Sequence, residues 1–198
     1  DNSLLPKYDF IVIDEAQDLR EEWFETIEGL IKPEGGFYVF MDEDQDIFGA
    51  FRKIGLSRNL FEFPLKENCR NTVEIIDFLK GYVSRDINYP IDSVKGEPVR
   101  IINYTNDTDQ MNKIKLEWLR LVEEEGIKPE QIVLMMNAHK RASCLNNVKK
   151  FGKYKIQALD RSGRFNKHAV NYTSINTFKG LEADVVMIID TDKPEKPD

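Results

Sequence analysis

Two adjacent carboxylates directly follow an apolar run near the start of the chain. Residues 10–15 read FIVIDE, so Asp14 and Glu15 come immediately after Phe10–Ile13. In open α/β sheets, chemistry collects at the carboxyl ends of the strands. A carboxylate there suits Mg²⁺, which prefers oxygen ligands, and a second one can accept a proton from an attacking water. The pair therefore suits metal-assisted phosphoryl transfer.

The same acidic stretch also has a purely structural interpretation. Acidic side chains are favourable at the N-terminus of a helix, and Asp18 and Glu21 have the spacing of a capping box. The residues of the following helix predicted to face inward are Trp23, Ile27, Leu30 and Ile31. This stretch by itself leaves both interpretations open.

A second group of polar residues follows the next apolar run. Gly35-Gly36 is predicted to break the chain, Phe37–Met41 to form a buried strand, and residues 42–48 then read DEDQDIF. Within this segment, Gln45 is a neutral donor and acceptor, suited to sensing a terminal phosphate. The alternative is an ordinary glutamine in a loop.

Short apolar runs alternate with longer amphipathic stretches along the chain. Such alternation predicts an α/β architecture with right-handed crossovers, and continuous apolar runs are typical of parallel sheets covered on both faces. Helices are predicted after Asp18, after Asn71-Thr72 with Val73, Ile76 and Leu79 inward, and around Met111–Val122. The predicted strands are Phe10–Ile13, Phe37–Met41, Val99–Tyr104, Ile132–Met136 and Val185–Ile189.

Composition narrows the class of protein. Of 198 residues, 41% are hydrophobic and 32% charged, and no run approaches the ~18 apolar residues of a membrane span. Cys69 and Cys144, without a CxxC pattern, argue against a disulfide framework or a zinc site. We therefore expect a cytoplasmic protein with no membrane partner.

The net charge of −7 is unevenly distributed. Residues 14–28 hold seven acidic side chains and one basic one, whereas residues 139–168 hold nine basic side chains and one acidic one. Phe151, Tyr154 and Phe165 are interleaved with these bases. This pattern is typical of a surface that follows a nucleic-acid backbone and stacks on bases, although a solvated face is the alternative.

Four segments together resemble a known family. DEAQD (14–18), MDEDQDIF (41–48), LKENCRNT (65–72) and SINTFKGLEADVVM (174–187) resemble motifs II, III, IV and V of superfamily 1 helicases of the UvrD/Rep type. They occur in the family's order between Phe10 and Ile189. The NCRNT form also resembles helicase-like proteins, some of which carry an N-terminal nuclease-related domain.

The resemblance implies a fold and an activity. It implies RecA-like parallel sheets with flanking helices, with residues 1–63 ending a first motor lobe, 64–190 forming most of a second and 191–198 a frayed tail. The activity implied is ATP-dependent movement on single-stranded DNA, or on RNA, with ATP and Mg²⁺ as cofactors. A non-catalytic helicase-like module that binds nucleotide or nucleic acid is the alternative.

The resemblance also implies roles for residues in the first lobe. Asp14 would coordinate the Mg²⁺ of bound ATP, and Glu15 would orient or deprotonate the attacking water. Gln45 would contact the γ-phosphate and couple the nucleotide to the DNA-binding loop.

In the second lobe, the resemblance concerns three further residues. Arg70 would reach the γ-phosphate, Gly180 would lie near it, and Glu182 would contact the sugar. A guanidinium suits stabilisation of a transferring phosphoryl group, although without the motif Arg70 would be interpreted as a surface salt-bridge former.

Nucleic-acid contacts are the least defined part of the resemblance. Ala50 stands where an aromatic residue is common in the family, and Asn176 replaces a usual histidine. The candidates for such contacts are Phe48, Phe51, Lys149, Lys150, Lys153, Asn176 and Lys179.

Two motifs of the family do not occur in this chain. No GxxxxGK[ST] phosphate loop is found, and motif VI is also absent. We expect the loop N-terminal to Asp1 and motif VI beyond Asp198, so the chain alone is not expected to hydrolyse ATP appreciably.

Overall fold

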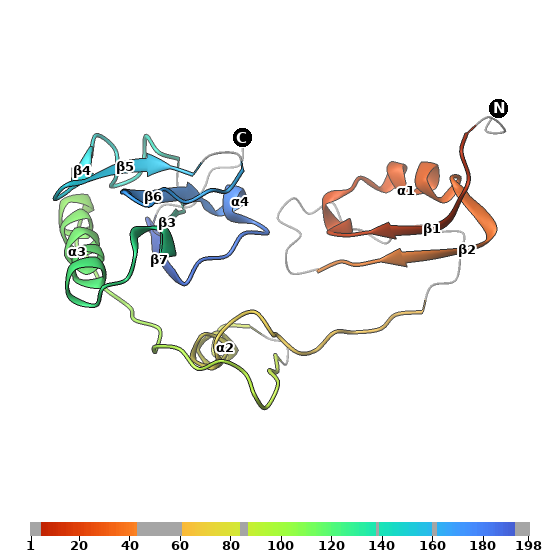
Figure 1. Cartoon of the computed structure of the whole chain (residues 1–198), viewed down its shortest axis with the longest axis horizontal. Coiled ribbons are helices and arrows are strands. Elements are labelled where there is room, and N and C mark those ends of the chain that lie inside the picture. Colours follow the sequence, from red (N-terminus) through yellow and green to blue (C-terminus); the bar gives the residue numbers. More distant parts are fainter. Residues whose placement is uncertain (1–4, 43–60, 84–86, 138, 160–161, 193–198) are drawn as a thin grey trace. The chain divides into compact units, whose positions relative to one another are not determined.

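The computed structural model describes residues 5–42, 61–83, 87–137, 139–159 and 162–192 (Figure 1). The chain divides into two compact units. Unit 1 comprises Asp1–Cys69 with Arg85–Asp92, and unit 2 comprises Arg70–Ser84 with Ser93–Asp198. Both contain parallel strands together with helices, so the predicted α/β class is confirmed. Within the described ranges, no helix is long and apolar enough to cross a membrane.

Unit 1 is built around a pair of parallel strands, β1 (Tyr8–Ile13) and β2 (Ile31–Val39). The short 3₁₀ helix η2 (Ala16–Asp18) and helix α1 (Glu21–Glu28) connect them. Helix α1 covers one face of the pair, where Phe24 packs with Ile13 and Ala16 (Figure 1). The strand predicted at Phe10–Ile13 is therefore confirmed.

The predicted start of the first helix is wrong, and its predicted inner face is correct for Ile27, which packs against the core of unit 1, but not for Trp23. Arg20, not Asp18, precedes the helix, and no side chain caps its first turn. Asp18 instead ends η2, where its backbone N–H donates to the Glu15 carbonyl at 2.9 Å. Phe24 is 2% exposed and Trp23 46%, because Phe24 faces the strands. The predicted inward residues Leu30 and Ile31 lie beyond the helix, and Ile31 begins β2.

The second strand begins before Gly35-Gly36, which was predicted to break the chain. Both glycines lie within β2, where the pairing with β1 shifts between Tyr8 and Phe10. A Cβ on Gly35 would lie 2.9 Å from the Asp9 carbonyl oxygen. The missing side chain thus allows the two backbones to approach at this irregularity.

The prediction that the parallel strands are covered on both faces holds for Ile132–Met136, where four of the five residues are buried, but not for β1. Tyr8, Phe10 and Val12 alternate along β1 and are exposed on the face away from α1. Tyr38 and Phe40 are also exposed. In unit 2, the edge strand β7 (Val185–Ile189) exposes Val186 and Ile188.

Unit 2 contains a five-stranded sheet in the order β4-β5-β6-β3-β7. Strand β3 is parallel to β6 and β7, and β5 is parallel to β6, whereas β4 and β5 form an antiparallel hairpin. The strands predicted at Ile132–Met136 and Val185–Ile189 are confirmed. The remaining strand bounds are β3 (Ile132–Met136), β4 (Lys150–Phe151), β5 (Tyr154–Ala158) and β6 (Ala169–Ser174).

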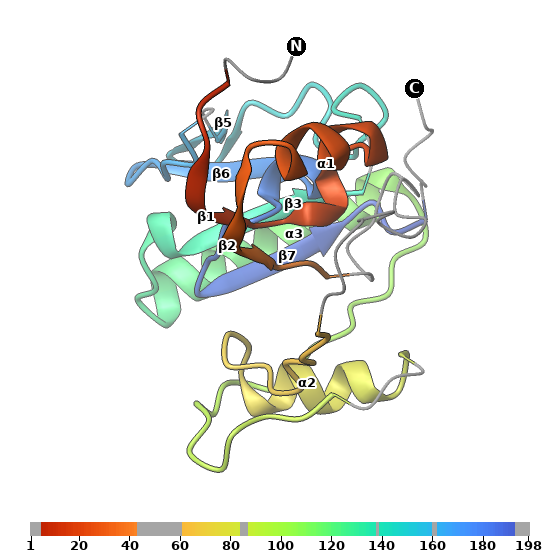
Figure 2. The same ribbon diagram turned by 90° about the vertical axis from the view of Figure 1, so that its right-hand side faces the viewer.

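Helix α3 (Asp107–Leu119) packs against this sheet (Figure 2). It begins after Asn106, whose side chain accepts the Asp109 N–H, and continues as a π-helical turn over Arg120–Glu124. Trp118 is fully buried at the centre of the core. The helix predicted around Met111–Val122 is therefore confirmed.

Two shorter helices complete unit 2. Helix α2 (Val73–Lys80) lies where a helix was predicted and buries Ile76. Helix α4 (Ile175–Phe178) follows β6 directly, and a 3₁₀ turn, Pro129–Gln131, precedes β3.

The strand predicted at Val99–Tyr104 does not form. These residues have no pairing partner among the described strands, and Ile101 is 67% exposed. Side chains hold this segment instead: Lys113 Nζ donates to the Asn103 carbonyl at 2.8 Å, and the Tyr104 hydroxyl donates to Asp192 at 2.5 Å.

Unit 2 should lose stability in acid because of Glu117. A hydrogen bond from Arg120 holds the pKa of this carboxyl below its ordinary value of 4.5. Burial opposes this shift, and the charges of Arg100 and Arg120 add to it. A lowered folded-state pKa contributes stability above pH 4.5 that is lost as the pH falls below it. We expect Glu117→Gln to flatten the dependence of the unfolding free energy on pH in this window, as measured by urea denaturation. An unchanged slope would contradict this assignment.

Candidate functional site

The carboxyl ends of β1 and β2 lie side by side in unit 1. The Phe40 N–H donates to the Ile13 carbonyl at 2.8 Å, and the Ala16 N–H donates to the Phe40 carbonyl at 3.0 Å. Asp14 and Glu15 therefore leave the sheet next to the segment that follows β2, and both side chains are exposed. This arrangement presents two carboxylates at the edge where parallel α/β sheets bind ligands.

The backbone turns sharply at Glu15. Its φ of 51° and ψ of 44° lie in the left-handed region, which non-glycine residues adopt at a cost of ~1–3 kcal/mol. One carboxylate oxygen of Asp14 accepts the Glu15 N–H at 3.0 Å. The turn separates strand β1 from η2 and so leaves the two acidic side chains on a loop outside both elements.

Gln17 ties this turn to the neighbouring strand. Its amide nitrogen donates to the carboxylate of Glu15, and its amide oxygen accepts the backbone N–H of Asp42 at 3.1 Å. The side chain is buried at 1% exposure. No role for Gln17 is predictable from the sequence, because nothing in the local pattern marks an amide between two acids as buried.

Asp14 has the chemistry of a magnesium ligand. Magnesium usually binds one or two carboxylates together with phosphate oxygens and waters. The exposed Asp14 carboxylate fits that role, and bound Mg²⁺ would neutralise charge on phosphate oxygens. Within the described ranges, no group of three or more His, Cys, Asp or Glu side chains is placed to hold a metal ion.

Unit 2 brings together two residues that the resemblance assigns to the nucleotide. Arg70 Nε lies 4.0 Å from the Glu182 carboxylate, with side chains 65% and 82% exposed. An ion pair this exposed contributes little to stability, so the guanidinium can exchange it for another anion. Gly180 has a φ of 78°, a left-handed backbone conformation that favours glycine. A Cβ at this position would meet no other atom within 4 Å.

The other residues of the fifth motif surround α4. Ser174 precedes this helix, and its hydroxyl accepts the Thr177 N–H at 3.2 Å. Asn176 is exposed within the helix, and Lys179, partly buried, follows it. Both lie within six residues of Glu182 in the chain, on the segment that links β6 to β7.

Four exposed lysines gather on the β4–β5 hairpin, at an edge of the sheet in unit 2. We call Lys149, Lys150, Lys153 and Lys155 the lysine hairpin. Lys150 and Lys155 are directly opposed in the antiparallel register. Like charges in such a pair are destabilising, so an anion that bound here would relieve their repulsion.

Of the aromatic residues predicted to stack on bases, Phe151 is not accessible for that role. Phe151 is fully buried and meets Trp118 edge-on at 6.1 Å between ring centroids. Tyr154 also packs on Trp118, at 4.8 Å. Phe165 is partly buried. The hairpin therefore presents its lysine ammonium groups to solvent, while Phe151 and Tyr154 pack it against Trp118.

Several predicted residues lie outside the described part of the chain. These are Gln45, Phe48, Phe51 and Arg161.

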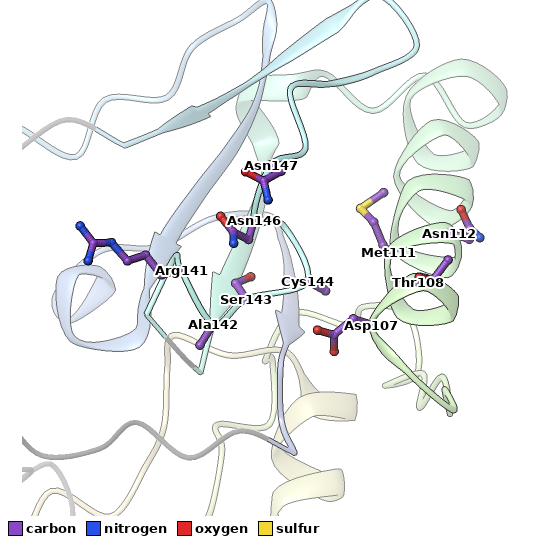
Figure 3. A pocket seen from close by; sticks show the side chains of 10 residues that line it. All are labelled: Asp107, Thr108, Met111, Asn112, Arg141, Ala142, Ser143, Cys144, Asn146 and Asn147. Carbon is purple, nitrogen blue, oxygen red and sulfur yellow. The ribbon is translucent and has the colours of Figure 1, made fainter.

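A hollow of about 370 Å³ opens elsewhere in unit 2, between the first turns of α3 and the loop after β3 (Figure 3). Thr108, Met111 and Asn112 line it from the helix, and Ser143 and Asn146 line it from the loop. No predicted site residue lines it, so we assign it no role.

No family model, curated protein or solved structure matches this chain.

Proposed function

We propose that this chain is the central part of an ATP-dependent helicase or translocase that moves on single-stranded DNA, or RNA, in the cytoplasm. The observation that carries the proposal is the pair Asp14 and Glu15, exposed at the carboxyl end of a parallel strand beside the end of β2. The segment that follows β2 carries Gln45, the predicted phosphate sensor. In this proposal, both units belong to RecA-like lobes.

The exposed face of unit 1 supports the view that its lobe contains further elements. A pair of strands is at best marginally stable, and parallel sheets are normally covered on both faces. Here Tyr8, Phe10 and Val12 expose an apolar row. We infer that strands and a helix outside this chain complete the sheet, and that the phosphate loop belongs to them.

The proposed mechanism gives each residue a limited task. Asp14 would hold Mg²⁺, which when bound would supply positive charge next to the phosphates of ATP. Glu15 orients the attacking water and accepts its proton. Arg70 stabilises the negative charge on the transferring phosphoryl group, and Glu182 contacts the sugar.

The experiment that tests this function uses the full-length protein containing this chain. We expect Mg²⁺-dependent ATP hydrolysis that single-stranded DNA or RNA stimulates. Nucleotide or nucleic-acid binding without hydrolysis would instead support the non-catalytic module, as would a degenerate or absent phosphate loop N-terminal to Asp1 in the full-length protein. Absence of binding to both would contradict both proposals.

We propose that the lysine hairpin contacts the phosphates of the nucleic acid. Replacing Lys149, Lys150 and Lys153 by Gln should then lower the slope of log K against log salt by ~2, since each phosphate contact on a single strand contributes ~0.7. Fluorescence anisotropy with a labelled oligonucleotide measures this slope in the full-length protein.

The matched control for this prediction removes the same charge elsewhere. Lys66, Lys95 and Lys128 are also exposed, and the triple Gln variant at these positions should keep the original slope. Equal slopes of log K against log salt for both triple variants would indicate that the lysine hairpin is a solvated face without phosphate contacts.

A further inference from the structure

Gln17 is a buried polar side chain among exposed acidic ones. It is 1% exposed, whereas Asp14, Glu15 and Asp18 are all exposed. Burial of an amide costs free energy unless its donor and acceptor are both satisfied. In Gln17 the donor meets the Glu15 carboxylate and the acceptor meets the Asp42 N–H.

The two contacts require an amide. The Glu15 carboxylate needs a donor and the Asp42 N–H needs an acceptor, and a neutral amide offers one of each at the same end of a side chain. An ionised Glu at position 17 could accept from Asp42 but could not donate to Glu15. A Met would make neither hydrogen bond while filling a similar volume.

These contacts link two functional segments. Glu15 belongs to the turn after β1, and Asp42 follows β2, three residues before Gln45. Because Gln17 itself is buried, its amide restricts the orientation of the Glu15 carboxylate to which it donates. A shift of the backbone at Asp42 would therefore alter the orientation of that carboxylate.

We propose that Gln17 is a positioning residue that aims the Glu15 carboxylate and couples it to the segment after β2. This inference rests on the proposed function, in which Glu15 acts on the attacking water. Its consequence is that loss of Gln17 slows the chemical step without weakening nucleotide binding, because the buried Gln17 amide is hydrogen-bonded to Glu15 and Asp42.

The test compares two substitutions in the full-length protein. Gln17→Glu keeps an oxygen for Asp42 but removes the donor to Glu15, and Gln17→Met removes both. We expect kcat for ATP hydrolysis to fall ~10- to 100-fold in both variants, as for a misplacement near 1 Å, while KM stays within ~2-fold. Exchange of the Asp42 backbone N–H, followed by NMR, should accelerate in Gln17→Met and not in Gln17→Glu.

Gln131 provides a matched control because it makes the same two kinds of contact in unit 2. Its amide oxygen accepts the Lys128 N–H at 3.0 Å, and its amide nitrogen donates to the Asp184 carboxylate at 2.6 Å. Gln131→Glu should leave kcat and KM unchanged. Thermal unfolding of each variant establishes that it is folded.

Two outcomes would overturn the proposal. One is a wild-type kcat in either folded Gln17 variant, and the other is a loss that resides in KM alone. Failure of the proposed function is distinguishable, because the wild-type full-length protein would then not hydrolyse ATP. If Glu15→Gln abolishes hydrolysis while both Gln17 variants remain fully active, only the role of Gln17 is wrong.

Discussion

Glu15→Gln is expected to lower kcat for ATP hydrolysis by the full-length protein ~10²- to 10⁴-fold, the usual contribution of a general base. The amide has the size of the carboxylate but cannot accept the proton of the attacking water. Nucleotide binding should persist, because the proposed magnesium ligand is Asp14. Steady-state hydrolysis and binding of a fluorescent ATP analogue measure the two quantities separately.

Glu25→Gln is the control for this result. Glu25 is exposed on α1 in the same unit and has no proposed role. Its replacement by Gln removes the same charge as Glu15→Gln. Hydrolysis at the wild-type rate in Glu15→Gln would refute the role of Glu15. A joint loss of binding and hydrolysis would assign Glu15 to nucleotide binding instead.

Arg70→Ala is expected to reduce kcat by ~10³-fold or more, as removal of an arginine that stabilises a transferring phosphoryl group does. Arg70→Lys should recover only part of the rate, since an ammonium keeps the charge but loses the planar fork of donors. The unfolding free energy should change by less than ~1 kcal/mol, because the pair with Glu182 is largely exposed.

Single-turnover kinetics of the full-length protein measures the rate of the chemical step in these variants. Arg141→Ala is the matched control, since Arg141 is exposed in the same unit and has no proposed role. A wild-type single-turnover rate in Arg70→Ala would show that Arg70 does not have the role that the resemblance to motif IV implies.

A strand was predicted correctly where an apolar run is both buried and paired with neighbouring strands. Ile132–Met136 is a continuous apolar run and forms the inner strand β3, with β6 and β7 on its two sides. Val99–Tyr104 is also rich in apolar residues, yet it pairs with no described strand. A strand needs a neighbour, and the presence of that neighbour is not encoded in the run itself.

The candidate site was predictable only in its local part. Asp14 and Glu15 follow a strand in the sequence, so their place at its end follows from the strand alone. Gln17 is buried and accepts a hydrogen bond from Asp42, 25 residues away, which no local pattern indicates. Phe151 and Tyr154 look like stacking residues beside lysines, but contact with Trp118 decides their position.

The opposed lysines of the β4–β5 hairpin carry a consequence for the free protein. Repulsion between Lys150 and Lys155 weakens the hairpin when no anion is near, so a bound polyanion would raise the melting temperature of unit 2. Neutralising either lysine should act in opposite directions on the two states, strengthening the free fold while weakening the complex. The edge of this sheet would then be a place where stability has been given up for affinity.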